Sequence, residues 1–348
     1  MRVLVVKMSS LGDVVHTLPA LTDAQRAHPE LRFDWLVEEG FAEIPGWHPA
    51  VERVVPVAIR RWRKSPLTSW RSGEPSRCRA TVRTAGYDLV IDAQGLIKSA
   101  WAARWARAPI AGLDRHSARE PLAALAYRQQ VAVPREMHAV ERTRQLFAAA
   151  LGYDKPVTQG DYRLDHSRFP AVERGEAPRV VFLHGTTRAD KHWPERYWRI
   201  LAEQATSAGS EVFLPWGNAA EQQRAQRIAA GLPGARVLPR LTLAGVAAQL
   251  LAADAVVAVD TGLAHLAAAL DRPTIALYGP TRPALVGTYG RHQIHLVAGE
   301  QPAVTGQDDI EPRAMALLTP EHVWSELGTL LATTRLAGGG AAIGPTGH

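Results

Sequence analysis

Three loops that follow predicted strands carry the side chains best suited to chemistry. The first loop, residues 7–13, ends at Asp13. An aspartate in this place can cap the helix that follows, and at the end of a strand it can also act as a general base. Both roles stay open for Asp13. The dinucleotide fingerprint G-x-G-x-x-G is absent from the loop, which argues against an NAD site.

The second loop, residues 184–194, suits phosphate binding. Gly185 would let the backbone approach a ligand closely. Thr186 and Thr187 offer hydroxyl groups, and Lys191 offers a positive charge for a phosphate oxygen. The Walker A pattern G-x-x-x-x-G-K-[ST] is absent. A polar loop with a surface lysine is the alternative interpretation.

The third loop joins a buried strand directly to a helix at residues 258–265. The backbone N–H groups of Thr261 and Gly262 would lie at the positive end of that helix, where anions bind. Asp260 suits the hydroxyl groups of a sugar. His265, one turn further on, either reaches the same ligand or is a structural histidine.

A further carboxylate completes a set that suits a nucleotide diphosphate sugar. Glu221 follows another predicted strand and could bind both hydroxyl groups of a ribose. The helix dipole and Lys191 could stabilise the leaving diphosphate. The sequence has no D-x-D tripeptide and no His/Cys/Asp/Glu spacing that demands an ion. We therefore expect no metal and no cofactor beyond the donor substrate.

These loops are positioned by strands and helices that alternate along the chain, twice over. Such alternation predicts an α/β protein with two Rossmann-like, doubly wound domains. We expect ligands beyond the carboxyl ends of the strands. The predicted parts are an acceptor-binding domain at 1–160, a nucleotide-sugar-binding domain at 175–320, a C-terminal helix at 321–335 and a disordered tail at 336–348.

The charge of the chain is concentrated in the first half. Residues 1–160 hold 23 Lys/Arg against 16 Asp/Glu, a net of +7, whereas the whole chain of 348 residues has +6. Residues 60–83 alone carry eight basic side chains and one acid, Glu74. This asymmetry indicates contact with a polyanion or an anionic surface, with a solvated helix face as the alternative. A basic nucleic-acid-binding protein is a second possibility, but no reader motif supports it.

The sequence offers no route across a membrane and no disulfide. No run approaches the ~20 apolar residues that a span requires, and the apolar run at the amino terminus is too short for a signal peptide. Cys78 is the single cysteine, which fits a reducing compartment. We expect a protein that is soluble or attached only to a membrane surface.

Several segments resemble the lipopolysaccharide heptosyltransferases of glycosyltransferase family 9. The resemblance extends with gaps over residues 1–330. It rests on MRVLVVKMSSLGDVVHTLPALT (1–22), FDWLVEEGF (33–41), VAIRRWRK (57–64), IDAQGLIKS (91–99), DKHWP (190–194) and VDTGLAH (259–265). It implies a GT-B fold, in which two Rossmann-like domains face a central cleft. The implied reaction is an inverting, metal-independent transfer of L-glycero-D-manno-heptose from ADP-heptose to the inner Kdo of Kdo2-lipid A.

The same resemblance assigns roles to individual residues. It implies that Asp13 is the general base, and that Lys191 and Asp260 also act in catalysis. The implied donor-binding residues are Thr186, Thr187, Lys191, Glu221, Leu241, Asp260, Thr261, Gly262 and His265. The implied acceptor-binding residues are Arg60, Arg61, Lys64, Lys98, Arg119 and Arg142.

The resemblance also implies a place in the cell and leaves near alternatives. It implies a cytoplasmic protein at the inner membrane of a Gram-negative bacterium, touching the cytoplasmic leaflet, with no nucleic-acid partner. A second type of heptosyltransferase or a sugar-nucleotide epimerase remains an alternative, which segments 57–64 and 91–99 decide. The sequence departs from the family pattern at Gly185, at Leu241 and in segment 66–80.

Overall fold

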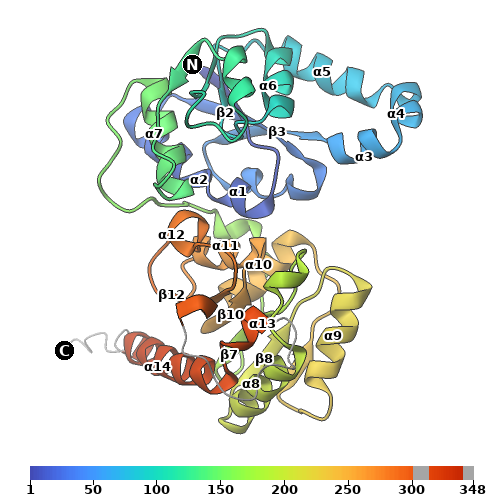
Figure 1. Cartoon of the computed structure of the whole chain (residues 1–348), viewed down its shortest axis with the longest axis vertical. Coiled ribbons are helices and arrows are strands. Elements are labelled where there is room, and N and C mark those ends of the chain that lie inside the picture. Colours follow the sequence, from blue (N-terminus) through green and yellow to red (C-terminus); the bar gives the residue numbers. More distant parts are fainter. Residues whose placement is uncertain (301–312, 340–348) are drawn as a thin grey trace, which may run out of the picture. The chain divides into compact units, whose positions relative to one another are not determined.

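A computed structural model describes residues 1–300 and 313–339 of the chain. They divide into two compact units, each an α/β layer structure (Figure 1). The first unit holds Met1–Arg168 with Ala284–Val286, and the second holds the rest. The predicted domain boundaries at 160 and 175 bracket this division and remain predictions.

The first unit is built on six parallel strands in the order β3-β2-β1-β4-β5-β6. Val3–Val6 of β1 are fully buried at the centre of this sheet. The strands are β1 (Arg2–Val6), β2 (Arg32–Glu38), β3 (Val51–Val57), β4 (Leu89–Asp92), β5 (Ile110–Leu113) and β6 (Gln129–Val131). The helices are α1 (Leu11–Val15), α2 (Leu18–Ala27), α3 (Ile59–Lys64), α4 (Pro66–Ser72), α5 (Glu74–Thr84), α6 (Ile97–Ala103) and α7 (Ala139–Leu151).

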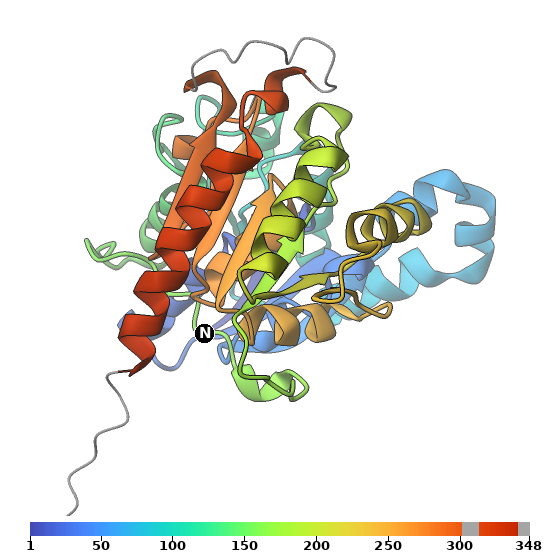
Figure 2. The same cartoon turned by 90° about the horizontal axis from the view of Figure 1, so that it is seen from below.

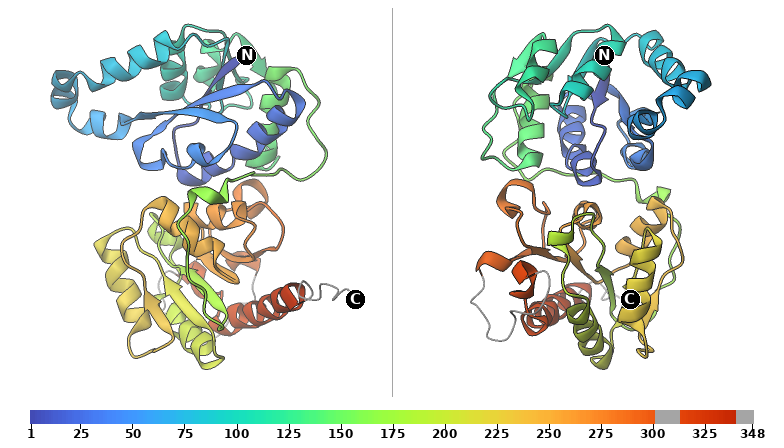
Figure 3. Two further views of the ribbon diagram at one scale, coloured as in Figure 1. Left: turned by 180° about the vertical axis from the view of Figure 1, so that it is seen from behind. Right: turned by 45° about the vertical axis from the view of Figure 1, so that its right-hand side comes forward.

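Helices cover both faces of this sheet. On one face α2 and α7 lie side by side (Figure 3). On the other, α5, α6 and two short 3₁₀ helices, η3 (Arg104–Ala106) and η4 (Pro121–Ala126), bury Val82, Ala102 and Ala123 against β1 and β4. Further 3₁₀ turns are η1 (Glu39–Phe41), η2 (Pro45–Trp47) and η5 (His166–Arg168).

The second unit repeats the plan with the strand order β12-β11-β10-β7-β8-β9, again parallel. The strands are β7 (Arg179–Leu183), β8 (Glu211–Leu214), β9 (Ala235–Val237), β10 (Ala255–Val259), β11 (Thr274–Tyr278) and β12 (Gln293–Val297). The helices and 3₁₀ turns are η6 (Ala189–Lys191), α8 (Glu195–Ser207), α9 (Ala219–Ala229), α10 (Leu243–Leu251), α11 (Gly262–Ala269), α12 (Pro283–Val286), η7 (Ala298–Glu300), α13 (Arg313–Ala316) and α14 (Pro320–Gly339).

One large apolar cluster of the second unit lies under three helices. α8, α9 and α14 pack on one face of its sheet (Figure 2), where Trp198, Ile228 and Leu327 meet residues of β7 and β10. Within the described residues, no helix has both the length and the apolar composition needed to cross a bilayer.

The predicted α/β class with two doubly wound halves is confirmed, and the details differ in two places. β5, β6 and β12 were not predicted: β5 and β6 are only four and three residues long, and β12 carries the polar residues Gln293 and His295. α14 spans Pro320–Gly339, so residues 336–339, predicted as part of a disordered tail, are helical. The rest of the predicted tail lies outside the described residues.

Candidate active site

Both sheets reverse their strand order at one point, and the candidate loops follow the strands there. In the first sheet the reversal lies between the neighbouring strands β1 and β4, because later strands are added on opposite sides of this pair. In the second sheet it lies between β7 and β10. Ligands of open α/β sheets bind at such switch points, beyond the carboxyl ends of the strands. Asp13 follows β1, the 184–194 loop follows β7, and Asp260 follows β10.

Asp13 belongs to the first turn of α1. The backbone N–H and the hydroxyl of Ser10 both donate to Asp13 Oδ2, at 2.8 and 3.0 Å, and Lys7 Nζ lies 3.8 Å from Oδ1. Ser10, not Asp13, is the N-cap residue, and Asp13 is the N3 carboxylate of a capping box. The interpretation of Asp13 as the N-cap was therefore wrong by three residues. Its side chain remains 38% exposed, so the carboxylate can both support the helix start and meet a ligand.

A cavity of about 360 Å³ in the first unit opens beside Asp13. Its walls include Lys7 and three arginines, Arg119, Arg135 and Arg142. Arg142 donates to the carbonyl of Ser117 at 2.6 Å, and burial, helped by the charge of Arg135, lowers its pKa. The four cations suit an acidic ligand. The carboxylate of Asp13 beside them suits the removal of a proton from a hydroxyl group of that ligand.

The floor of this cavity is fixed by Gln94, which follows β4. Its side-chain oxygen accepts from the backbone N–H groups of Met8 and Ser9, at 2.8 and 3.1 Å, and its amide donates to the Ser9 carbonyl. Lys7 Nζ donates to the carbonyl of Ala93 at 2.8 Å. The loops after β1 and β4 are thus joined directly, which holds the backbone leading to Asp13 in place.

The predicted acceptor-binding residues separate into two groups. Arg119 and Arg142 share the cavity with Asp13. The other four do not line it: Arg60, Arg61 and Lys64 lie on α3, and Lys98 lies on α6. Arg61 is bonded to both Glu39 and Glu74 at 2.8–3.1 Å. An acceptor anion would have to compete with these two carboxylates for Arg61. Lys64 is exposed at the end of α3.

Glu38 links the remaining two predicted acceptor residues. This carboxylate ends β2 and is 6% exposed, and it accepts from the backbone N–H of Arg60 at 3.1 Å. Burial raises the pKa of Glu38, although the Arg60 hydrogen bond and the charges of Arg60 and Lys98 act in the opposite direction. Arg60 and Lys98 therefore face a carboxylate of the protein itself.

In the second unit, an ion pair joins the two candidate donor loops. Lys191 Nζ lies 2.6 Å from Asp260 Oδ2, and the two side chains are 16% and 10% exposed. The hydroxyl of Thr186 donates to the carbonyl of Asp260 at 3.1 Å. Thr187, the next residue, is exposed. A phosphate binding here would meet a cation that is already in position.

The start of α11 lies directly after Asp260. Thr261 is the N-cap, its backbone is extended (φ −144°, ψ 156°), and no side chain caps the helix. Gly262 is the first helical residue, and His265 is buried one turn later. A helix start with no side-chain cap beside Lys191 has the polarity that a diphosphate requires.

Glu221 lies against the loop that follows β7. Its Oε2 accepts from the backbone N–H of Gly217 at 2.7 Å. A Cβ atom on Gly185 would stand 2.8 Å from the carboxyl carbon of Glu221, so the carboxylate rests on the bare backbone of Gly185. Leu241 lies half-buried just before Thr242, the N-cap of α10. Glu221 thus contacts the 184–194 loop, which is the loop predicted to bind phosphate.

Sequence reasoning missed two residues beside these sites. Arg135 lines the Asp13 cavity from a loop whose local sequence gives no signal. Arg224 donates to the carbonyl of His184 at 3.3 Å and lies 2.8 Å from His192 Nδ1. It stands three residues after Glu221 on α9, a spacing that could have identified it. Burial, together with the charge of Arg224, lowers the pKa of His184 to about 4.

Comparison with known proteins places this geometry in a family. The sequence model of glycosyltransferase family 9 (heptosyltransferase) matches residues 76–312. The chain belongs to glycosyltransferase family 9. It is 62% identical to lipopolysaccharide heptosyltransferase 1 of Pseudomonas aeruginosa over 85% of this chain and 83% of that protein.

Solved heptosyltransferase structures agree with this membership. E. coli heptosyltransferase WaaC with ADP superimposes with a TM-score of 0.86 at 49% identity, covering 95% of this chain and all of that one. The same enzyme with ADP-2-deoxy-2-fluoro heptose gives 0.85 at 48%, covering 94% and 99%. The GT-B type of α/β fold expected for this glycosyltransferase is confirmed. Family membership favours glycosyl transfer over epimerisation and over nucleic-acid binding.

The described part of the chain has no candidate metal centre. Within residues 1–300 and 313–339, no three His, Cys, Asp or Glu side chains gather closely enough to hold an ion. Groups that can stabilise a leaving diphosphate are nevertheless present, namely Lys191 and the start of α11.

Proposed function

We propose that this glycosyltransferase moves L-glycero-D-manno-heptose from ADP-heptose to the inner Kdo of Kdo2-lipid A, with inversion at the anomeric carbon. The observation that carries the proposal is that one unit has a carboxylate in a basic cavity and the other has groups suited to a diphosphate. The first unit has a carboxylate set among Lys7, Arg119, Arg135 and Arg142. The second unit has Lys191 beside the uncapped start of α11. Relatives named as lipopolysaccharide heptosyltransferase 1 support the same reaction.

On the acceptor side, Asp13 is the general base. It takes the proton from the attacking hydroxyl as that oxygen bonds to the anomeric carbon. The cations of the cavity hold the carboxylates of the Kdo residues. Arg119, Arg135 and Arg142 are the main acceptor ligands in this proposal, because Arg61 is already bonded to Glu39 and Glu74.

On the donor side, the second unit binds the ADP group. Lys191, Thr186, Thr187 and the N–H groups of Thr261 and Gly262 hold the diphosphate, with His265 behind them. Glu221 binds the ribose, Leu241 contacts the adenine, and Asp260 accepts from heptose hydroxyls. When the glycosidic bond breaks, negative charge grows on the diphosphate, and Lys191 and the α11 dipole stabilise it. The reaction therefore needs no metal ion in this proposal.

Nucleotide binding and a transfer assay test the proposal. Titration calorimetry with ADP, UDP and GDP should show binding of ADP at least tenfold tighter than the others, and transfer from ADP-heptose should yield heptosylated Kdo2-lipid A by mass spectrometry. Equal affinities for the three nucleotides, or release of free heptose without an acceptor product, would refute it.

The proposed acceptor also fixes where the protein works. Kdo2-lipid A is an amphiphile, so the enzyme must meet it at a membrane surface, which we propose is the cytoplasmic leaflet of the inner membrane in a Gram-negative bacterium. The excess positive charge of the first half suits an anionic leaflet.

A further inference from the structure

The outer face of the helical layer formed by α6 and η4 exposes large apolar side chains. On α6, Ile97 and Trp101 are 51% and 58% exposed, and they share one face of the helix because they are four residues apart. Beside α6, Leu122 and Leu125 of η4 are 65% and 82% exposed. A group of neighbouring, exposed apolar side chains is typical of a surface that contacts a protein or a membrane. We call these four residues, with Arg104, the α6–η4 face.

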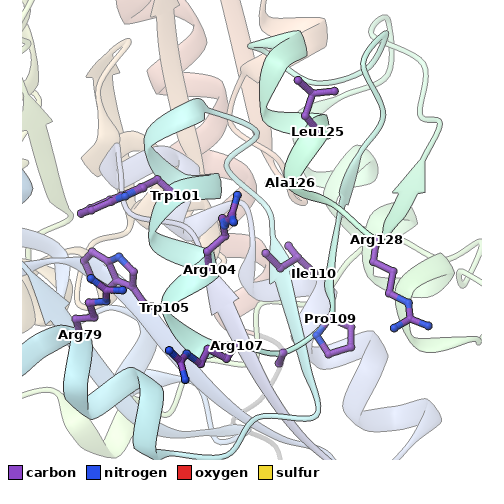
Figure 4. Close-up of a pocket in the computed structure, with 11 residues that line it drawn as sticks. Arg79, Trp101, Arg104, Trp105, Arg107, Pro109, Ile110, Leu125, Ala126 and Arg128 are labelled. Carbon is purple, nitrogen blue, oxygen red and sulfur yellow. The ribbon is translucent and has the colours of Figure 1, made fainter.

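A cavity of about 770 Å³ opens on this face and is strongly basic. Arg79, Arg104, Arg107 and Arg128 line it, together with Trp101 and Trp105 (Figure 4). Each of the four arginines is exposed. No Asp or Glu is among the lining residues, and within the described residues none of the four guanidinium groups has an ion pair. Four unneutralised cations on one cavity would attract an anion.

Two tryptophans, Trp101 and Trp105, form part of the cavity wall. Trp105 is 4% exposed and its indole Nε1 is buried with no partner within the described residues. The ring of Trp101 packs edge-on against it at 4.9 Å, so an aromatic pair forms one wall. An aromatic wall beside four arginines combines apolar surface with positive charge in one cavity.

This cavity is separate from the one beside Asp13. Pro109 and Arg128 immediately precede β5 and β6, so the basic cavity lies at the amino ends of these strands. The Asp13 cavity lies at the carboxyl ends of the same parallel sheet and shares no lining residue with it. Ile97, however, follows the carboxyl end of β4. The α6–η4 face therefore runs from the edge that carries the reaction to the basic cavity.

We propose that the α6–η4 face docks on an anionic phospholipid bilayer. The arginines meet lipid phosphates, which accept from the guanidinium groups, while Trp101, Leu122 and Leu125 enter the interfacial region. A soluble phosphate compound would leave the exposed leucines and Ile97 without a role, and so would a nucleic acid. The proposal deepens the proposed function, because it names the surface by which an enzyme with a lipid-borne acceptor reaches the membrane.

Vesicle co-sedimentation of the full chain tests this docking. Vesicles that mix phosphatidylglycerol with phosphatidylcholine should bind it, whereas pure phosphatidylcholine vesicles should bind it weakly. Arg104→Gln/Arg107→Gln should weaken binding about 10–30-fold, because each basic side chain near an anionic surface contributes about fivefold. Trp101→Ser/Leu125→Ser should weaken it about tenfold through lost apolar burial.

Matched variants serve as controls. Arg196→Gln/Arg291→Gln removes two exposed arginines of the second unit, and Val157→Ser removes a fully exposed valine away from the face. Both should bind vesicles as the parent does. Glycerol phosphate is the soluble probe, and it should not displace the protein from vesicles at millimolar concentration.

The outcomes separate docking from catalysis. Equal binding to both vesicle types, full binding by the two face variants, or displacement by glycerol phosphate would each overturn the docking proposal. All variants should transfer heptose normally to a deacylated acceptor in solution. Loss of vesicle binding with this turnover intact supports docking, whereas vesicle binding without any turnover refutes the proposed function alone.

Discussion

At the scale of single residues, the ion pair of Lys191 with Asp260 lies at the centre of the proposed donor site. Both side chains are mostly buried, and the pair spans two loops that lie 69 residues apart in sequence. In the proposed function, a diphosphate that binds Lys191 shares this cation with Asp260, and the remaining lone pairs of Asp260 accept from sugar hydroxyls. In that proposal one ion pair therefore serves both parts of the donor.

Replacement of Lys191 tests this view. Lys191→Met should weaken ADP binding about 10–100-fold, the value of one charge-assisted hydrogen bond to a phosphate. Arg188→Met is the matched control. Arg188 is a cation of the same loop, and its ion-pair partner is Asp190 rather than Asp260. Calorimetry with ADP should show little change for the control. Equal losses in both variants would indicate a general electrostatic effect rather than a specific contact.

At the scale of elements, strand-to-helix junctions were predictable and distant neighbours were not. The loops after β1, β7 and β10 were found because a buried strand, a glycine and a helix start follow one another in the sequence. Arg135 was not found, because its place beside Asp13 depends on how α7 packs on α2. The bonding of Arg61 to Glu39 and Glu74 was equally hidden, since it joins α3 to η1 and to α5.

The contact between α2 and the turn after η2 predicts a dependence of stability on pH. His48 is 1% exposed, its Nδ1 accepts from the N–H of Ala50 at 3.1 Å, and its Nε2 lies 2.9 Å from the hydroxyl of Thr22. Burial lowers the pKa of His48 from 6.5 to about 4. The unfolded chain therefore takes up this proton first as the pH falls.

The contribution of neutral, buried His48 to the free energy of unfolding is full above pH 6.5 and is lost as the pH falls toward 4. Between pH 7.5 and pH 5 this group should cost about 2 kcal/mol of unfolding free energy. Urea unfolding of His48→Gln should show a smaller decrease over this range than the parent, by about that amount. An identical decrease in both proteins would contradict the assignment of a neutral, buried His48.

At the scale of the whole molecule, each unit has apolar clusters of its own. One apolar cluster lies in the first unit around β1 and β4, and another lies in the second around β7 and β10. Each sheet has its own switch point, so the proposed acceptor and donor sites are each built on one sheet. ADP should accordingly order one unit only.

Hydrogen exchange can measure this division. ADP at about 100 times its dissociation constant should stabilise the protein by about 2.7 kcal/mol. Peptides covering 184–193, 217–221 and 260–265 should exchange more slowly, and those covering 7–16 should not change. UDP at the same concentration is the control. Protection of 7–16 that equals protection of the donor loops would contradict the division.

The central claim is that Asp13 deprotonates the acceptor while the second unit holds ADP-heptose. Asp13→Asn tests it most directly, because an amide oxygen can still accept from Ser10 and keep the start of α1. Transfer from ADP-heptose to Kdo2-lipid A should fall ~10²–10⁴-fold, with the affinity for ADP unchanged. Turnover close to that of the parent protein, or a loss of ADP affinity that explains the decrease, would contradict the account.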